Sequence, residues 1–399
     1  MKTVKVAHTA DIHVGKNGKA RDELKGDDIW KDQDRYDALY QMAGDVAGEE
    51  PDVVLVSGDL FDTPRPPYNA MFAVMQALKT ITGCGARVVI IQGNHSTSGS
   101  WDEVRESSPL KILGMMDGVD VAYEKTERFI YEDLNLEITA VPDWVLVQKE
   151  EIPKAQDNGR IQVLMVHGVA EGGSGAEYSL LERKHRDIDA GKFQEYDFVA
   201  LGHFHKHMAI KGGNAYYPGS TCTLTFGEEW VKGWILAEIG KGSLSVEFRE
   251  LETRTWFTVR ANVKNETGSK EILGVVKAAL KEKKKELGIR NSEGCAVRII
   301  LENCQAGVHK VPDREKFENL VEGAVMVRIE RITEEGVDVE LEVEGIKDRR
   351  GDWTSYMQTR EKAGWIPAGE EVGILTEEGI EMMEIHGALD ERAEGEKVA

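Results

Sequence analysis

The sequence contains few cysteines and no long hydrophobic segment. Its four cysteines are scattered and form no Cys-x-x-Cys pair, which excludes a disulfide framework or a zinc knuckle (Cys84, Cys222, Cys295 and Cys304). No apolar run reaches the roughly 18 residues needed to cross a bilayer. The first residues also lack the apolar core of a secretory signal. These absences predict a cytoplasmic protein, nucleoid-associated if the cell is prokaryotic, with no membrane partner.

Basic residues are outnumbered by acidic ones. The 399 residues include 50 Lys+Arg against 71 Asp+Glu, a formal net charge of −21. Long-range electrostatics of this sign repel nucleic acids. A chain of this kind that acts on a polyanion needs local help from bound cations, a basic patch or a partner. The length allows one large core and at least one smaller one.

Five short apolar segments rich in β-branched residues predict strands that are buried on both faces. The first three alternate with predicted helices, at 32–48 and from Pro66-Pro67 onward. This order predicts an α/β fold. The five predicted strands cover residues 4–9, 53–56, 88–91, 161–166 and 198–201.

Polar residues that can bind metals follow the end of each of these five strands. In open α/β sheets, ligands bind at the carboxyl ends of the strands. A single histidine is more often structural than a ligand, by roughly three to one, but five such strand ends together predict one site. Its residues are Asp11, His13, Asp59, Asn94, His95, His167, His203 and His205.

This set of side chains suits hydrolysis of a phosphodiester. Two metal ions roughly 3.5–4 Å apart can lower the pKa of a bound water and clamp the phosphate. One carboxylate must bridge the two ions, and Asp59 is the candidate. Mixed imidazole and carboxylate ligands favour manganese, iron or zinc over magnesium and calcium.

The order of motifs identifies a resemblance. Asp-x-His, Gly-Asp-x-x-Asp, Gly-Asn-His, His-Gly and Gly-His-x-His follow one another as in the calcineurin-like metallophosphoesterase superfamily. Local variants resemble the SbcD-type nucleases of DNA double-strand-break repair, over about residues 1–240. These variants are Ala10–Gly15, Gly58–Asp62, Tyr217–Thr221, Phe226–Glu228 and Lys232-Gly233.

The resemblance implies a fold of sheets flanked by helices, with a smaller α+β capping domain and a helical C-terminal tail. It also implies two Mn²⁺ per chain, with iron or zinc possible in the cell. One metal takes Asp11, His13, Asp59 and His205; the other takes Asp59, Asn94, His167 and His203.

His95 is not a ligand in the resembling family. It positions the phosphate and assists departure of the leaving group, while a hydroxide on the metals attacks. The chain departs from the family at Ser96, where an acid usually follows Gly-Asn-His. This change either retunes His95 or is neutral.

The remaining candidates have plainer interpretations. His8 is expected to pack in the sheet, His207 to lie on the surface or behind the ligands, and Asp62 and Asp143 to cap turns. The basic run 281–285 is expected to be a solvated helix face, with a DNA contact as the alternative at about one in four. Three further histidines receive no role: His185, His309 and His386.

Composition and pattern divide the chain into three parts. Residues 1–250 are expected to form the metallophosphoesterase (nuclease) domain. Residues 251–345 predict an α+β module with strands at 256–263, 296–301 and 325–332 and helices at 269–287 and 314–320. The resembling family carries a capping domain here that shapes the DNA-binding cleft.

Residues 346–399 form an acidic tail with a predicted helix from Thr376. In the resembling family such a segment docks on the coiled coil of an SbcC-like ATPase; the alternative is a helix that folds back on its own domain. The family also dimerises through helices after the second and third strands, here near 67–80 and 107–116. The alternative is that these side chains pack on the sheet.

The leading hypothesis is a manganese-dependent DNA nuclease. It would be the exonuclease and endonuclease subunit of a complex for DNA repair and recombination. Three alternatives remain: another phosphodiesterase of the superfamily acting on a small substrate, a protein phosphatase, and a non-catalytic scaffold at DNA ends. The capping module and the tail favour the DNA nuclease over an enzyme acting on a small substrate. Thr63 and Ser96 depart from the usual phosphatase motifs, and the complete ligand set disfavours the scaffold.

Overall fold

The computed structural model describes residues 3–15, 28–95, 108–170, 187–210, 212–264, 268–304, 309–333 and 336–341. No helix within these ranges is long and apolar enough to span a membrane. Contacts divide the chain into two units. The first holds the described residues up to Cys222 together with Trp230–Thr253, and the second holds Thr223–Glu229 and the described residues from Arg254 onward.

The first sheet of the first unit contains β1 (Val4–Thr9), β2 (Val53–Ser57), β3 (Arg87–Ile91), β4 (Val119–Ala122), β13 (Gly233–Gly240) and β14 (Ser243–Glu250). Its strand order is β14-β13-β1-β2-β3-β4. Strands β1 to β4 are parallel, and β13 and β14 extend the sheet as an antiparallel hairpin. The parallel arrangement places the carboxyl ends of β1, β2 and β3 at one edge.

The second sheet contains β5 (Glu127–Tyr131), β6 (Leu136–Val141), β7 (Ile161–His167), β10 (Phe198–Gly202), β11 (Met208–Ala209) and β12 (Ala215–Tyr217). Its order is β11-β12-β10-β7-β6-β5. The four central strands are parallel, and the two edge strands are antiparallel to their neighbours.

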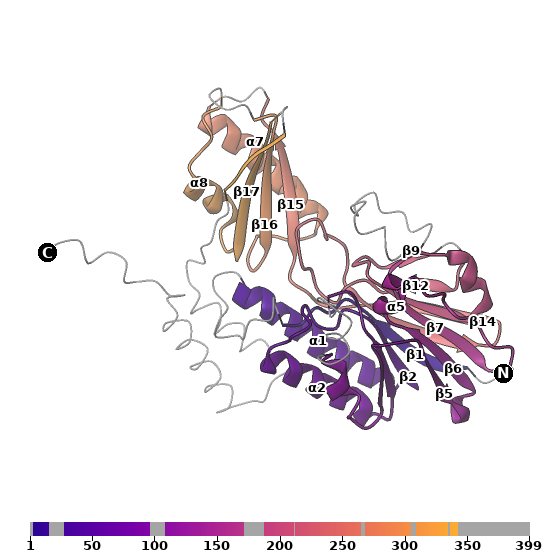
Figure 1. Cartoon of the computed structure of the whole chain (residues 1–399). Coiled ribbons are helices and arrows are strands. Elements are labelled where there is room, and N and C mark those ends of the chain that lie inside the picture. The colour runs from indigo at the N-terminus through magenta and orange to yellow at the C-terminus, as the bar shows by residue number, and fades with distance from the viewer. Residues whose placement is uncertain are drawn as a thin grey trace, which may run out of the picture. The chain divides into compact units, whose positions relative to one another are not determined.

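The two sheets pack face to face around a buried core that includes Val6, Leu55 and Val89 from the first and Met165 and Phe198 from the second. Helices α1 (Asp28–Glu49) and α2 (Tyr68–Gly83) cover the outer face of the first sheet (Figure 1). Helix α5 (Asp143–Val147) and the 3-10 helix η4 (Ala190–Glu195) cover the second. The predicted sandwich of sheets flanked by helices is therefore confirmed.

The second unit contains a four-stranded sheet of order β15-β16-β17-β18. Strands β15 (Trp256–Asn262), β16 (Ala296–Glu302) and β17 (Met326–Thr333) are parallel, and β18 (Gly336–Leu341) is antiparallel to β17. Helix α7 (Ser269–Glu286) packs on this sheet through Ile272, Val276 and Leu280. Helix α8 (Arg314–Glu318) packs on it through Phe317. The predicted tail, 346–399, lies outside the described residues.

Candidate metal centre

Loops that follow strands of both sheets meet at one edge of the sandwich. Strands β1, β2 and β3 of the first sheet lead into five of the predicted side chains, and β7 and β10 of the second lead into three. The structure brings all eight together (Asp11, His13, Asp59, Asn94, His95, His167, His203 and His205). Most are buried, which is where a polar group needs a partner.

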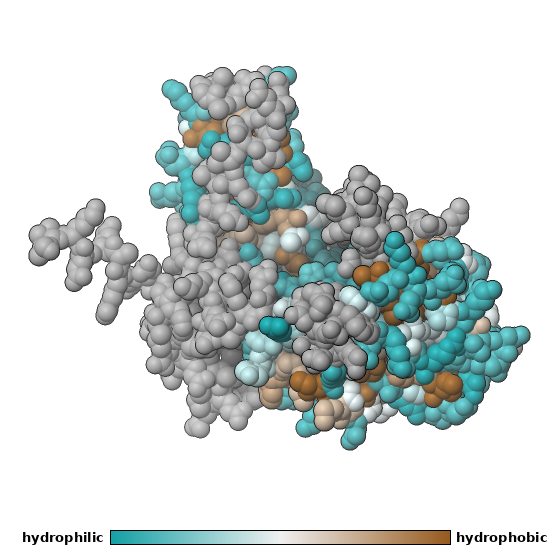
Figure 2. Space-filling model, in the orientation of Figure 1, coloured by the Kyte–Doolittle hydropathy of each residue, from teal (hydrophilic) through white to brown (hydrophobic). Residues whose placement is uncertain are grey.

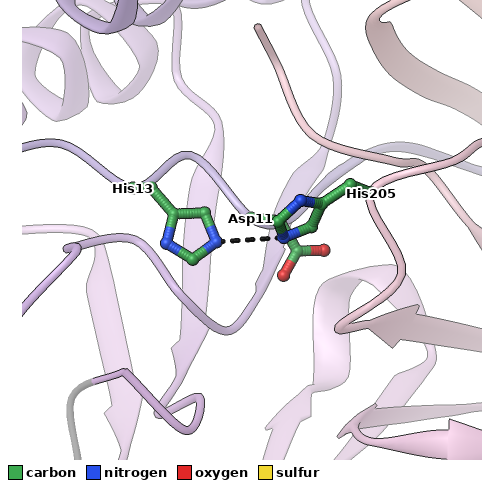
Figure 3. A group of neighbouring side chains, drawn as sticks. All are labelled: Asp11, His13 and His205. Atoms are coloured by element: carbon green, nitrogen blue, oxygen red, sulfur yellow. Dashed lines mark hydrogen bonds between the residues drawn. The ribbon is translucent and has the colours of Figure 1, made fainter. Parts of the chain in front are cut away.

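Asp11, His13 and His205 form what we call the first ligand set. Figure 3 shows the two imidazoles pointing at one another beside the Asp11 carboxylate. The Nε2 atoms of His13 and His205 lie 3.2 Å apart, and all three residues offer a ligand atom within 4.8 Å of the others. Two nitrogens bound about 2.1 Å from one ion lie roughly 3.0–3.4 Å apart at octahedral or tetrahedral angles. The spacing therefore fits one shared cation.

Asn94, His167 and His203 form the second ligand set. The Asn94 Oδ1 atom lies 2.9 Å from His167 Nε2 and 3.0 Å from His203 Nδ1. These spacings also suit atoms that surround one cation. The set combines an amide oxygen with two imidazole nitrogens, a mixture that divalent transition metals accept.

Asp59 lies between the two sets. Its Oδ2 atom is 3.3 Å from His167 Nε2 and 3.9 Å from His13 Nε2. Its Oδ1 atom accepts a hydrogen bond from the His95 backbone N–H at 2.9 Å. A carboxylate placed in this way can bridge two ions, as expected for Asp59 from the sequence.

The end of β2 determines the orientation of the His167 ring. Its Nδ1 atom lies 2.8 Å from the Ser57 carbonyl oxygen, which can only accept, so Nδ1 carries the proton and Nε2 can present a lone pair to a metal. Gly58 makes this approach possible. It has φ +91°, and a Cβ there would overlap the His167 ring.

Four of the site residues have a left-handed backbone, a conformation that costs energy in residues other than glycine. The φ angles are 53° at Asp11, 53° at His13, 45° at Asp59 and 106° at His203. Hydrogen bonds hold this geometry, including those from the His203 N–H to both Asp11 carboxylate oxygens at 3.1 and 3.0 Å. Backbone strain concentrated in this way is typical of functional sites.

Electrostatics in the metal-free chain favour the charged form of His167, in which Nε2 carries a second proton. Burial opposes its charged form, but the Asp59 and Asp11 carboxylates outweigh burial and raise the pKa of His167 to about 9. Burial raises the pKa of Asp11. The surrounding histidines lower the pKa of Asp59 despite its burial, whereas burial lowers the pKa of His13. A metal ion that binds His167 therefore has to displace a proton.

The sequence profile of the calcineurin-like phosphoesterases matches residues 4–207, about half of the chain. The chain belongs to the calcineurin-like phosphoesterase family. Membership shows a hydrolase of phosphoesters, and the two ligand sets around Asp59 are suited to two metal ions. Which phosphoester is cleaved does not follow from membership alone.

Three solved structures are similar to this calcineurin-like phosphoesterase. A dimetal phosphatase from Danio rerio is 10% identical, with a TM-score of 0.38 over 63% of this chain and 97% of its own. The protein TT1561 of Thermus thermophilus is 9% identical, with a TM-score of 0.34 over 62% and 99%. Purple acid phosphatase PPD1 from yellow lupin, Lupinus luteus, is 13% identical, with a TM-score of 0.39 over 62% and 51%. Likeness at this level carries no argument about substrate.

His95 differs from the predicted ligands by its exposure, although it also offers a ring nitrogen within 4.8 Å of ligand atoms of His13 and Asp59. Its side chain is 44% exposed, whereas those of His13 and His167 are almost completely buried. The His95 Nδ1 atom lies 3.4 Å from the Asp62 backbone oxygen. This arrangement holds the ring from its Nδ1 side at the rim of the site.

Asp62 is the residue whose role sequence analysis missed. Its Oδ1 atom lies 3.4 Å from His13 Nδ1 and 3.9 Å from His95 Nδ1. The turn-capping role expected for Asp62 leaves out both contacts. A signal was present, because Asp62 is the final residue of the Gly-Asp-x-x-Asp motif. A carboxylate behind a ligand histidine orients the ring and keeps its proton on the nitrogen that faces the carboxylate, so that the other nitrogen is free for the metal.

The remaining histidines make other contacts, whereas Asp143 is completely buried and its charge acts to raise the pKa of His167. His8 is buried in β1 with its ring edge against Phe198, as expected, and burial lowers its pKa to about 3. His207 stacks on Phe248, and His309 lies 2.8 Å from the Val263 carbonyl oxygen through Nε2. Three positions named from the sequence lie outside the described residues: Ser96, His185 and His386.

Proposed function

We propose that this calcineurin-like phosphoesterase hydrolyses the phosphodiester bonds of DNA with two manganese ions. In this proposal it is the nuclease subunit of a double-strand-break repair complex with an SbcC-like coiled-coil ATPase. The observation that carries the two-metal part is the pair of ligand sets around Asp59, with His95 exposed beside them. The resemblance of the local motifs to SbcD-type nucleases supports the DNA part.

The side chains divide the chemistry between them. Two bound metal ions would supply a nucleophile at neutral pH and neutralise the phosphate oxygens. His95 stands outside both ligand sets, so its Nε2 atom can carry the proton that the departing oxygen needs. Asp62 holds His95 and His13 from behind through their Nδ1 atoms. Mixed nitrogen and oxygen ligands favour manganese, iron or zinc.

The net charge of −21 means that DNA has to be held by local features. The second unit offers exposed cations at the end of α7, where Lys281 and Lys285 face solvent. Lys283 is paired with Glu286 and Glu229 and offers less. We therefore propose that the α+β unit is a cap that contacts DNA. The docking of an ATPase on 346–399 also stays a proposal.

A homodimer through α2 and the short helix α4 (Leu110–Leu113) is part of the same proposal. Apolar side chains are exposed on both helices and just after α4 (Tyr68, Phe72, Met75, Ile112 and Met115). Figure 2 shows hydrophobic residues in the region where Figure 1 labels α2. Others on α2, such as Val74 and Leu78, pack on the sheet instead. Phe72→Arg should shift the sedimentation of the protein to that of a monomer; a wild-type protein that is already monomeric would exclude the dimer.

The experiment that tests the DNA substrate compares linear duplex DNA, single-stranded DNA and bis(p-nitrophenyl) phosphate. Each is incubated with manganese, magnesium or a chelator, using wild type and His95→Asn. We expect manganese-dependent cleavage of DNA that the chelator abolishes and the variant reduces. Hydrolysis of the small diester without any cleavage of DNA would overturn the DNA proposal and favour a small-molecule phosphodiesterase.

A further inference from the structure

The backbone carbonyl oxygen of His205 lies where several hydrogen-bond donors meet. The indole Nε1–H of Trp230 donates to it at 2.7 Å, and the Ser220 N–H donates at 3.2 Å. The ammonium of Lys232 lies 3.5 Å from the same oxygen. A carbonyl with this many donors is held more firmly than an ordinary loop carbonyl.

Lys232 is an unusual member of this group because its side chain is buried, with 2% of the residue exposed. Its Nζ atom donates to Ser220 Oγ at 2.7 Å, and the Ser220 hydroxyl lies 3.0 Å from the Cys222 carbonyl oxygen. The ammonium also lies 5.2 Å from the centre of the Trp230 ring, within reach of a cation–π interaction. Burying an ammonium is unfavourable unless its surroundings compensate. The burial of this charge indicates that Lys232 has a function beyond filling space.

The segment that Lys232 anchors, Tyr217–Ser220, passes close to the ligand-bearing loop. Gly219 has φ +83°, and a Cβ there would lie 2.9 Å from the His207 nitrogen and 3.0 Å from the His205 oxygen. At its other end, the Tyr217 hydroxyl donates to the Gly168 oxygen at 2.8 Å. The segment thus lies against the chain next to two predicted ligands, and we call it the strap.

His205 needs such support more than His167 does. His167 is the last residue of β7 and is also hydrogen-bonded to β2. His205 lies three residues beyond the end of β10, which is Gly202. Loop residues are more mobile than strand residues unless side chains tie them down. The strap and its anchors provide that tie at the peptide that carries the His205 ring.

We propose that Lys232 and Trp230 are positioning residues that hold the His205 backbone so that its imidazole meets His13 and Asp11. They act on the first ligand set and leave the second unaffected. This inference rests on the assignment of His205 as a metal ligand. It gives a role to residues of the Tyr217–Thr221 and Lys232-Gly233 motifs, which have no part in the chemistry proposed above.

The test measures manganese binding by the full-length metal-free protein, with calorimetry and electron paramagnetic resonance. Lys232→Met keeps the stem of the side chain and removes the charge; Trp230→Phe keeps a ring and removes the N–H donor. We expect one of the two manganese ions to bind about 10- to 100-fold more weakly in each variant, the usual effect of losing support behind a ligand. The other ion should bind with unchanged affinity.

Matched controls are available in the same sheet. Trp234→Phe replaces a buried tryptophan whose Nε1 has no hydrogen-bond partner among the described residues, and Lys241→Met replaces an exposed lysine of a surface ion pair. Both should bind two ions as wild type does. Excess manganese should restore the kcat of Lys232→Met on bis(p-nitrophenyl) phosphate, a recovery that a general packing defect would not show.

Two outcomes separate failure of this inference from failure of the ligand assignment. His205→Ala should lose one ion; if it retains both, the ligand assignment is wrong and the inference falls with it. If His205→Ala loses one ion while Trp230→Phe and Lys232→Met bind both with wild-type affinity, only the positioning role is overturned. Should Lys232→Met not fold, Trp230→Phe decides the question.

Discussion

The two ligand sets of the metal centre are held in different ways. In the second set, His167 ends a central strand and its Nδ1 is fixed by a carbonyl of the facing sheet. In the first set, His205 lies in a loop, and His13 adopts a left-handed backbone beside Asp62. His167 is thus supported by strands, whereas His13 and His205 are supported by side chains and the strap. The two sets should respond differently to substitution, except at the residue that they share.

That shared residue gives the largest expected effect. Asp59→Ala removes the carboxylate that lies near ligands of both sets, so both should lose affinity together. We expect metal content to fall from two ions per chain towards none, and hydrolysis to fall to background. Metal analysis after dialysis measures the content, and Asp133→Ala, which removes an exposed carboxylate, is the control. Two retained ions with full activity would remove Asp59 from the centre.

His95→Asn should separate chemistry from metal binding. His95 lies outside both sets, so the variant should keep two ions, whereas hydrolysis should fall by about 10²- to 10⁴-fold, the usual contribution of a general acid. Single-turnover kinetics at saturating manganese provides the measurement. If the variant instead loses an ion, His95 is a metal ligand and belongs to one of the two sets.

A change of pH should divide the two sets without any mutation. His167 has a pKa of about 9 in the metal-free chain, so below pH 9 an ion of the second set competes with its proton. Affinity should fall roughly tenfold per pH unit, or by about two orders of magnitude from pH 8.5 to 6.5. Burial lowers the pKa of His13, so a proton competes less for this ligand of the first set than it does for His167.

Calorimetry in buffers of different ionisation enthalpy reports the protons released on binding. At pH 7, binding of the ion at His167 should release about one proton, and binding of the other ion should release less through His13. Equal pH dependence of both ions would contradict the division. Because Asp59 is shared, the comparison should be repeated with His167→Asn, which should abolish the proton release.

Asp62→Asn should have the smallest of these effects. It keeps the shape of the side chain and removes the charge behind His13 and His95. Loss of a carboxylate behind a ligand histidine typically lowers metal affinity by about 10- to 100-fold. We expect the lower end here, confined to the first set, because Asp62 lies 3.4 Å from His13. Competition with a fluorescent chelator provides the affinity, with Asp133→Asn as control.

The sequence predicts the positions of the strands that carry the ligands better than it predicts how these strands pair into sheets. β2, β7 and β10 are buried throughout, and β3 is buried after Arg87, so their apolar composition marks them and the polar residues at their ends. Their division between two sheets depends on pairing between distant segments, which no local pattern records. The edge strand β14 was missed because its residues alternate between exposed and half-buried ones.

The supports of the site escape prediction for a similar reason. The left-handed backbone at Asp11 and Asp59 arises from contacts between the loops after β1 and β2, such as the hydrogen bond from the His13 N–H to the Asp59 oxygen at 3.0 Å. Lys232 gives no sign in the sequence that it is buried. Ligands follow from residue type and strand position, whereas their supports follow only from tertiary structure.

The central claim is that two metal ions share Asp59 between the two ligand sets. Anomalous diffraction at the manganese edge, from crystals grown or soaked with manganese, tests it most directly. We expect two peaks, one among Asp11, His13 and His205 and the other among Asn94, His167 and His203, with Asp59 in contact with both. A single peak, or a peak with His95 among its ligands, would contradict it.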